Sequence, residues 1–283
     1  MLLNASGCLD ALVAPEVARS LDAFVTKTVT PLPREGNEPA RIAEVDAGIL
    51  NAIGLANPGR ERFLAETLPR LRELGVPLWV SVGGFCAEDY AETCARLEGV
   101  TVELNLSCPN VDEAPESAAE IVAACRAATE LGLYAKLSPA LPKIDEAARA
   151  VEDAGADGLS LVNTIRGLTL DPRTLQPKLA RAVGGYSGPA LKPIALAAVY
   201  ACRRAVALPI VGMGGVSTGR DALELIAAGA AHVALGTALF SDPDAPAHVR
   251  AELVAEAAAH GFAHPDNACG VAHDLDRTSR VLG

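Results

Sequence analysis

The chain has 283 residues, half of them apolar and only 4% aromatic, which is enough sequence for one large α/β domain with a full hydrophobic core. Its 24 basic and 35 acidic side chains give a formal net charge of −11 at pH 7, and an acidic surface repels the phosphates of nucleic acid. The composition therefore argues against a nucleic-acid-binding protein, and we interpret the acidity as serving solubility.

The seven cysteines are scattered along the chain, and no two of them form a C-x-x-C pair. The sequence therefore predicts neither a disulfide framework nor a metal site, and it favours a reducing, cytoplasmic compartment. The first residues, MLLNASGCLDALV, have no basic segment followed by a long apolar run, so no signal peptide is predicted. No stretch reaches about 18 uninterrupted apolar residues, so no membrane-spanning segment is predicted either.

Short apolar segments recur along the chain, each apolar on both faces and each ending in small or polar residues. Strands of a buried parallel sheet have this pattern. The predicted strands lie at 2–6, 23–28, 78–83, 102–107, 133–138, 158–164, 209–215 and 232–237.

Helix-like segments lie between these strands. The segment 61–74 places its leucines on roughly one face. The segment 117–131 opens with Ser117 and has Glu120 three residues later, which is the pattern of a capping box. Further helices are predicted at 145–156, 193–206, 219–230 and 245–261.

The alternation of strand and helix, repeated eight times in about 250 residues, predicts an α/β protein with a (β/α)8 fold, a TIM barrel. A doubly wound open sheet is the alternative, but it would carry G-x-G-x-x-G after the first strand, and NASGCLDA lacks that pattern. No linker divides the sequence, so a single domain over 1–283 is expected. The segment 29–59, long and rich in Pro and Gly, is inserted after the second strand, where we expect a lid or a pocket wall.

The active site of a TIM barrel lies at the C-terminal ends of its strands. Five of the chain's eight asparagines fall at those ends or in the inserted segment, which indicates a polar pocket. Asparagine offers both a donor and an acceptor, so several could orient a planar ring with amide and carboxylate edges, although they move no protons. The polar residues in these places are Lys27, Asn51, Asn57, Asn105, Asn110, Lys136, Asn163 and Thr164.

The glycine-containing sequences GMGGV and GTALF follow the seventh and eighth strands. Glycines let backbone N–H groups approach an anion, and barrels commonly bind phosphate at these two strands. Plain turns are the alternative interpretation, and the position on the barrel favours a phosphate cradle. The two lysines leave three roles open: a phosphate clamp, a Schiff base or a partner for an anionic ring.

Cys108 is the candidate proton-transferring group, because no histidine lies at a strand end. A thiol beside Pro109 in an irregular loop could act as a general base if its pKa were lowered. The alternative is a small buried apolar side chain, and we assign that role to the other six cysteines.

A series of motifs, in order from residue 4 to about residue 240, resembles the class 1 branch of the dihydroorotate dehydrogenase family. Single motifs such as GMGG are weak, whereas the ordered set is specific and ELNLSCPNV is its strongest member. The motifs are NASG, VTKTVTPLPREGNEPAR, LNAIGLANPG, ELNLSCPNV, AKLSP, VNTIRG, GGYSGPALKPIAL, PIVGMGGV and LGTALF.

The resemblance implies an FMN enzyme that oxidises dihydroorotate to orotate in pyrimidine synthesis, with Cys108 removing the C5 proton while C6 gives a hydride to the flavin. It places substrate binding at Lys27, Asn51, Asn105, Asn110, Asn163 and Thr164. It places FMN binding at Ala5, Ser6, Gly7, Lys27, Asn105, Lys136, Val162, Gly188, Gly214, Gly215, Gly236 and Thr237.

The subclass follows from VNTIRG and GGYSGPALKPIAL, which are more similar to the 1B type than to the fumarate-using 1A type. The 1B type works with a second subunit that carries FAD and an iron–sulfur cluster and passes electrons to NAD. A homodimer is also expected. The alternatives are a related FMN barrel, such as a dihydropyrimidine dehydrogenase or a dihydrouridine synthase, and a flavin-binding barrel without turnover.

Overall fold

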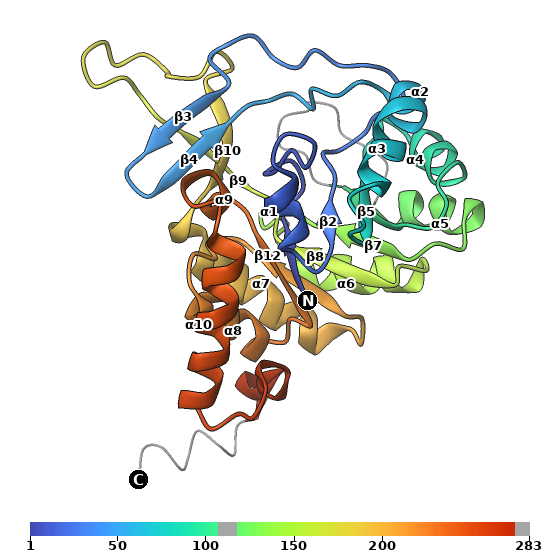
Figure 1. Cartoon of the computed structure of the whole chain (residues 1–283). Helices are drawn as coiled ribbons and strands as arrows, with labels where there is room; N and C mark the ends of the chain where they lie inside the picture. The colour runs from blue at the N-terminus through green and yellow to red at the C-terminus, as the bar shows by residue number, and fades with distance from the viewer. Residues whose placement is uncertain (107–117, 275–283) are drawn as a thin grey trace.

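The computed structural model describes residues 1–106 and 118–274 (Figure 1). All eight predicted strands are present and pair in parallel in the order β1-β12-β11-β8-β7-β6-β5-β2. A further bridge between Leu3 and Ala23 joins the two end strands, so the predicted TIM barrel is confirmed and the open sheet was the wrong alternative. The strands are β1 (Leu2–Asn4), β2 (Phe24–Val25), β5 (Leu78–Val82), β6 (Thr101–Asn105), β7 (Leu133–Lys136), β8 (Gly158–Leu161), β11 (Ile210–Met213) and β12 (His232–Leu235).

The seam between β1 and β2 is held by a side chain, because β2 contributes only two residues. The fully buried amide of Asn4 accepts a hydrogen bond from the Val25 N–H and donates one to the Val25 carbonyl, both at 2.8 Å. The Asp22 N–H adds a bond to the Leu2 carbonyl at 2.9 Å. Asn4 therefore substitutes for missing ladder bonds and closes the barrel.

Helices cover the outside of the barrel, and the six predicted helical segments are all present (Figure 1). Three shorter helices, α1, α4 and α9, were not predicted. Ser117 lies outside the described residues, but α8 begins with a capping box in which the Asp221 N–H donates to Thr218 Oγ1. The helices are α1 (Pro15–Arg19), α2 (Arg60–Arg62), a π-helical turn (Phe63–Thr67), α3 (Leu68–Arg72), α4 (Ala87–Cys94), α5 (Ala118–Ala128), α6 (Ile144–Asp153), α7 (Lys192–Ala205), α8 (Gly219–Ala227), α9 (Ala238–Ser241) and α10 (Ala245–Ala259), with 3₁₀ turns at Pro189–Leu191, Pro265–Ala268 and Val271–His273.

The main core lies between the barrel and these helices, and a second, smaller core fills the barrel interior. Inside the barrel the rings of Trp79 and Tyr134 meet at 4.3 Å between centroids. A Cβ at Gly158 would stand 2.2 Å from the Tyr134 ring, so the glycine makes room for the aromatic side chain. The interior is thus filled, as in other TIM barrels, by side chains in layers.

A four-stranded antiparallel sheet stands beyond the C-terminal ends of the barrel strands, at the upper left of Figure 1. The inserted segment after β2 contributes β3 (Ile42–Val45) and β4 (Gly48–Asn51). A second insertion, which the sequence analysis did not predict, contributes β9 (Ile165–Leu168) and β10 (Val183–Ser187). The strand order is β3-β4-β10-β9, so the two insertions meet along β4 and β10.

Among the described residues, none of the helices has the length and apolar character that a membrane span requires.

Candidate active site

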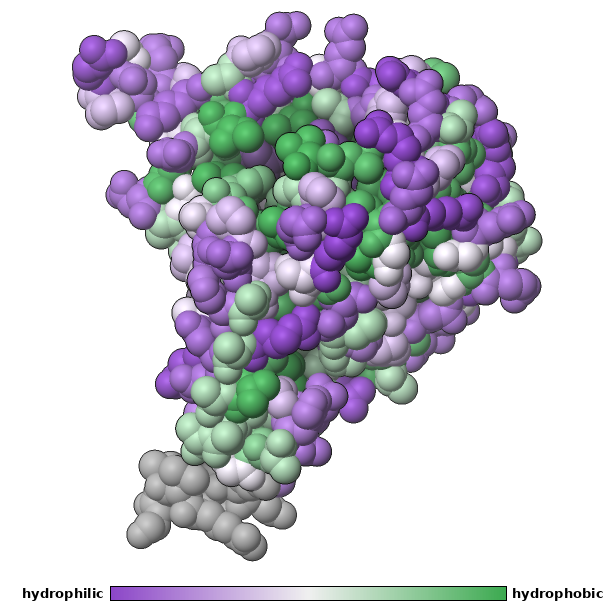
Figure 2. Space-filling model, viewed as in Figure 1, coloured by the Kyte–Doolittle hydropathy of each residue, from purple (hydrophilic) through white to green (hydrophobic). Residues whose placement is uncertain are grey.

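A cavity of about 300 Å³ lies between the C-terminal ends of the barrel strands and the four-stranded sheet. Figure 2 shows apolar side chains gathered around a hollow in this part of the surface. Two predicted site residues, Cys108 and Asn110, lie outside the described residues. All the other residues that the family resemblance assigns to substrate or flavin line the cavity: Ala5, Ser6, Gly7, Lys27, Asn51, Asn105, Lys136, Val162, Asn163, Thr164, Gly188, Gly214, Gly215, Gly236 and Thr237.

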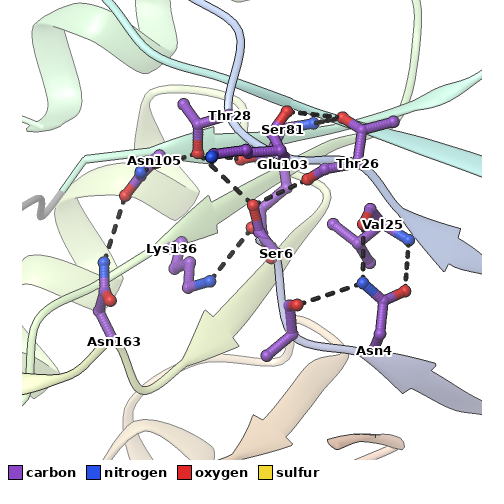
Figure 3. Close-up of polar contacts among 12 residues, drawn as sticks. Asn4, Ser6, Val25, Thr26, Thr28, Ser81, Glu103, Asn105, Lys136 and Asn163 are labelled. Atoms are coloured by element: carbon purple, nitrogen blue, oxygen red, sulfur yellow. Dashed lines mark hydrogen bonds and ion pairs between the residues drawn. The ribbon is translucent and has the colours of Figure 1, made fainter. Parts of the chain in front are cut away.

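Two asparagines, from the ends of β6 and β8, form a hydrogen-bonded chain along one side of the cavity (Figure 3). Asn163 Nδ2 donates to Asn105 Oδ1 at 3.2 Å, and Asn105 Nδ2 donates to Thr28 Oγ1 at 3.1 Å. The Thr164 N–H donates to Asn163 Oδ1 at 2.8 Å, and Thr28 is linked to Ser81 at 2.9 Å. Each amide is therefore held in one orientation by its neighbours, which suits a ligand with a fixed pattern of donors and acceptors.

Asn51 reaches the cavity from the opposite side, at the end of β4. It pairs in register with Gly185 of β10, and Asn51 Nδ2 donates to the Gly185 carbonyl at 3.2 Å. A Cβ at Gly185 would lie 2.1 Å from Thr164 Oγ1, so this glycine lets β10 pass close to the cavity edge. The contact between the two insertions thus places one predicted binding residue opposite the others.

Asn57 was expected in the same pocket, and that expectation was wrong. Its Oδ1 accepts hydrogen bonds from the N–H groups of Thr30 and Gly59, at 3.2 and 2.9 Å. Its Nδ2 donates to Thr30 Oγ1 at 2.7 Å. Asn57 is a structural residue of the loop, because its amide satisfies backbone groups that no helix or strand pairs.

The two predicted lysines differ in their surroundings. Lys136 is only 5% exposed, and its Nζ lies 3.3 Å from Oε1 of Glu103, which is 1% exposed. Lys27 has an exposed side chain at the cavity wall, yet desolvation of its ammonium, and then the nearby Arg41 guanidinium, lower its pKa. Two cationic groups around one cavity favour an anionic ligand.

Cys8 also lines the cavity and was not predicted as a site residue. Burial raises the pKa of its thiol to about 11, while the Lys136 ammonium acts in the lowering direction and the Glu103 carboxylate in the raising direction. At neutral pH the thiol is therefore protonated and is no candidate for a base. Its place directly after Gly7 in the first strand–helix loop is the only sequence signal that could have located it.

The glycines after β11 and β12 have the geometry of an anion cradle. Gly214 and Gly215 have φ values of 115° and 79°, and a Cβ at Gly215 would meet the Lys192 backbone nitrogen at 2.7 Å. In the described turns and loops, no hydrogen bond between backbone groups is donated by the N–H of Gly214, Gly215, Gly236 or Thr237. These N–H groups border the cavity and fit the phosphate of a nucleotide-like cofactor.

Apolar side chains from both the inserted segment and the barrel complete the lining of the cavity. The inserted segment 29–59, predicted as a lid or a pocket wall, contributes Ile42, Ile49, Ile53 and Leu55 to the lining. The barrel side contributes Val162, Leu191 and Met213. A cavity lined by both hydrogen-bonding and apolar side chains suits a flat heteroaromatic ligand.

A family model described as dihydroorotate dehydrogenase matches residues 1–256 of the chain. The chain is 44% identical over 264 residues to the dihydroorotate dehydrogenase B (NAD(+)) catalytic subunit of Desulforudis audaxviator, covering 89% of this chain and 86% of that protein. The protein of the same name from Latilactobacillus sakei is 45% identical over 260 residues, covering 86% and 84%.

A putative dihydroorotate dehydrogenase A (fumarate) from Solibacter usitatus is 44% identical over 245 residues, covering 83% of this chain and 81% of that protein. Among solved structures, the chain is similar in fold to a dihydroorotate dehydrogenase from Eimeria tenella, crystallised with ferulenol. The TM-score is 0.78 at 23% sequence identity, covering 96% of this chain and 85% of that one.

Proposed function

The chain belongs to the dihydroorotate dehydrogenase family, and on that premise we propose that it oxidises dihydroorotate to orotate in pyrimidine biosynthesis, with FMN as its cofactor. One observation carries the proposal. Every described residue that the motif series assigns to substrate or flavin lines the same cavity, although these residues come from seven barrel strand ends and from both insertions. A fold alone would not bring this set together.

FMN would be held at its phosphate by the backbone N–H groups of Gly214, Gly215, Gly236 and Thr237. When bound, FMN accepts the two electrons of the oxidation. The Lys136 ammonium supplies positive charge to the same cavity, which favours a ligand that carries or gains negative charge.

The substrate would be bound by Asn51, Asn105, Asn163 and Thr164, with Asn110 completing the set. Orotate carries a carboxylate and amide edges, and the exposed Lys27 ammonium offers that carboxylate a charged partner. The hydrogen-bonded pair Asn163–Asn105 presents an already oriented amide, so little ordering is left for the moment of binding.

Cys108 is proposed as the general base that takes the C5 proton. It follows Asn105, the last residue of β6 and part of the cavity lining, by three positions. Cys8 is not a rival for this role, because its thiol stays protonated at neutral pH. A general base must lie within reach of the ring carbon that loses its proton, and Cys108 is close in sequence to Asn105, which the proposal assigns to the substrate.

The electron acceptor is proposed to be NAD, reached through a separate subunit. Two relatives at 44–45% identity are named B (NAD(+)) catalytic subunits. We propose that the partner carries FAD and an iron–sulfur cluster, because this sequence has no clustered cysteines for such a centre. A homodimer of this chain remains part of the proposal.

The test is a visible spectrum of the purified chain titrated with FMN, followed by anaerobic addition of dihydroorotate. We expect a bound flavin that bleaches with substrate, and reoxidation by NAD only when the electron-transfer subunit is present. Cys108→Ser should keep the flavin and lose at least about a hundredfold in the bleaching rate. Cys269→Ser, at an exposed position, is the matched control and should bleach normally. A Cys108→Ser variant with full activity would refute the assigned base.

A further inference from the structure

A buried carboxylate beneath the cavity has no part in the function proposed above. Glu103 lies in the middle of β6 and is 1% exposed, and it is absent from the cavity lining. Its carboxylate lies 3.3 Å from the Lys136 ammonium (Figure 3). Burial of a carboxylate is costly, and an apolar pair of similar volume would serve stability as well or better. The ion pair therefore calls for a functional explanation.

The surroundings of the pair are polar and enclosed. In the strand register, Ser81 of β5 stands beside Glu103, and Ser160 of β8 stands beside Lys136. Both serines are fully buried, and Ser160 Oγ has no hydrogen-bond partner among the described residues. Because the pair is buried and both neighbouring serines are uncharged, the field of the carboxylate is weakly screened.

The field of Glu103 reaches the cavity wall. Lys136 lines the cavity, and Glu103 Oε1 lies only 3.3 Å from its ammonium, so both charges stand at the cavity wall. For the Cys8 thiol, which also lines the cavity, the ammonium favours a lower pKa and the carboxylate a higher one. The two charges therefore act on the same point of the cavity with opposite sign. A ligand in the cavity therefore experiences the positive field of the ammonium, weakened by the carboxylate behind it.

We propose that Glu103 is a positioning residue for the redox reaction: it holds the Lys136 ammonium at the cavity floor and offsets part of its charge, and so limits how strongly the site stabilises the reduced flavin. This proposal rests on the proposed function, since it concerns the charge gained by bound FMN. Lysine has a long flexible stem, and an ion pair at its tip confines the ammonium to one place. The offset keeps the reduced cofactor from becoming so stable that it passes its electrons on slowly.

The direct test is the midpoint potential of bound FMN in Glu103→Gln, which keeps the shape of the side chain and removes its charge. With the ammonium no longer offset, we expect the reduced state to be favoured roughly tenfold more than in the wild type, an upward shift of about 30 mV for a two-electron couple. Glu103→Asp, which keeps the charge with a shorter reach, should lie between the two. An unchanged or lower potential in Glu103→Gln would overturn the proposal.

A second measurement needs no cofactor. Removing the carboxylate should lower the pKa of the Cys8 thiol, because Glu103 acts on it in the raising direction. In the flavin-free chain, the rate of Cys8 alkylation by iodoacetamide at pH 8.5, followed peptide by peptide in a mass spectrometer, should rise several-fold in Glu103→Gln. An unchanged rate would mean that the field of Glu103 does not reach the cavity.

Asp157→Asn is the matched control. Asp157 is paired with Arg126 at 2.9 Å and accepts the Leu133 N–H at 2.8 Å, beside the N-terminal end of β8 and away from the cavity lining. This variant should be less stable without a shift in potential or in Cys8 alkylation. If both variants shift alike, the effect is general loosening and the proposal is wrong. If the wild-type chain binds no FMN either, the proposed function fails, and the alkylation rates still decide whether the charge of Glu103 acts at the cavity.

Discussion

Two neighbouring layers of the barrel interior have opposite characters. The apolar layer is made by the Trp79 ring, which is 5% exposed, and the half-buried Tyr134 ring packed over Gly158. One inward position further along the same strands comes the polar layer, which contains Ser81, Glu103, Lys136 and Ser160. The cavity opens beyond it, at the C-terminal ends of the strands.

The two layers differ in what they contribute: the apolar layer stabilises the barrel, and the polar layer sets the charge next to the cavity. Burial of two large aromatic rings in contact supplies hydrophobic stabilisation and a favourable ring geometry. Burial of Glu103 and Lys136 brings desolvation costs that their mutual attraction at best offsets. Overpacking of the apolar layer should therefore lower stability, whereas a change of charge in the polar layer should alter ligand binding.

The largest effect is expected from Gly158→Val, which breaks the apolar layer. A Cβ at this position would lie 2.2 Å from the Tyr134 ring, which β8 and the Trp79 contact leave little room to move. The free energy of unfolding should fall by about 3 kcal/mol. Urea unfolding measures it, and FMN affinity below the transition should stay near that of the wild type. If the folded variant also lost FMN affinity, the two layers would not be independent.

Asn163→Ala should give the next largest effect, on the ligand rather than on the fold. It removes the donor to Asn105 and the acceptor of the Thr164 N–H, so the asparagine chain loses its fixed orientation. The dissociation constant for orotate should rise about tenfold. Calorimetric titration measures it. Asn267→Ala, at a 3₁₀ turn that does not line the cavity, is the control and should leave orotate binding unchanged.

Ser160→Ala should make the protein more stable, by about 1 kcal/mol, because the serine hydroxyl is buried without a partner among the described residues. Ser81→Ala is the opposite case, since it leaves Thr28 without the hydroxyl that lies 2.9 Å from it, and it should be destabilising. Thermal unfolding distinguishes the two. A destabilised Ser160→Ala would show that the hydroxyl has a partner, such as a bound water.

The smallest effect concerns acid stability at the barrel seam, at a residue that belongs to neither layer. Burial tends to raise the pKa of Asp22, but hydrogen bonds from Arg250 and from the Leu2 N–H outweigh it, so the pKa is lowered in the folded state. The stabilisation is therefore present above the unfolded-state pKa of about 4 and is lost as pH falls through the lower folded-state value. In Asp22→Asn, the free energy of unfolding should fall less on acidification. The difference from the wild type should be a few tenths of a kcal/mol, because Asp22 is partly exposed. The urea midpoint measured between pH 3 and 6 tests this. If the midpoint depends on pH equally in the variant and the wild type, the carboxylate contributes nothing.

The local pattern of apolar residues was sufficient to predict the barrel. All eight barrel strands were predictable because a strand buried on both faces leaves a continuous apolar run, as in the β5 sequence LWVSV. The second insertion was missed for the same reason. The β10 sequence VGGYS and the β9 sequence IRGL lack such a run, because these strands are paired in a small, partly exposed sheet.

The sequence by itself determined the TIM barrel, the end of the barrel at which the site lies and many of the described residues that line it, because strand periodicity and the ordered motifs are local properties of the chain. Only the tertiary structure decided that Asn57 serves its own loop, that Cys8 borders the cavity, and that Glu103 and Lys136 form one buried pair. Each of these depends on which side chains meet across neighbouring strands or within a folded loop. Such meetings are set by strand register and loop path, which no single segment of the sequence encodes.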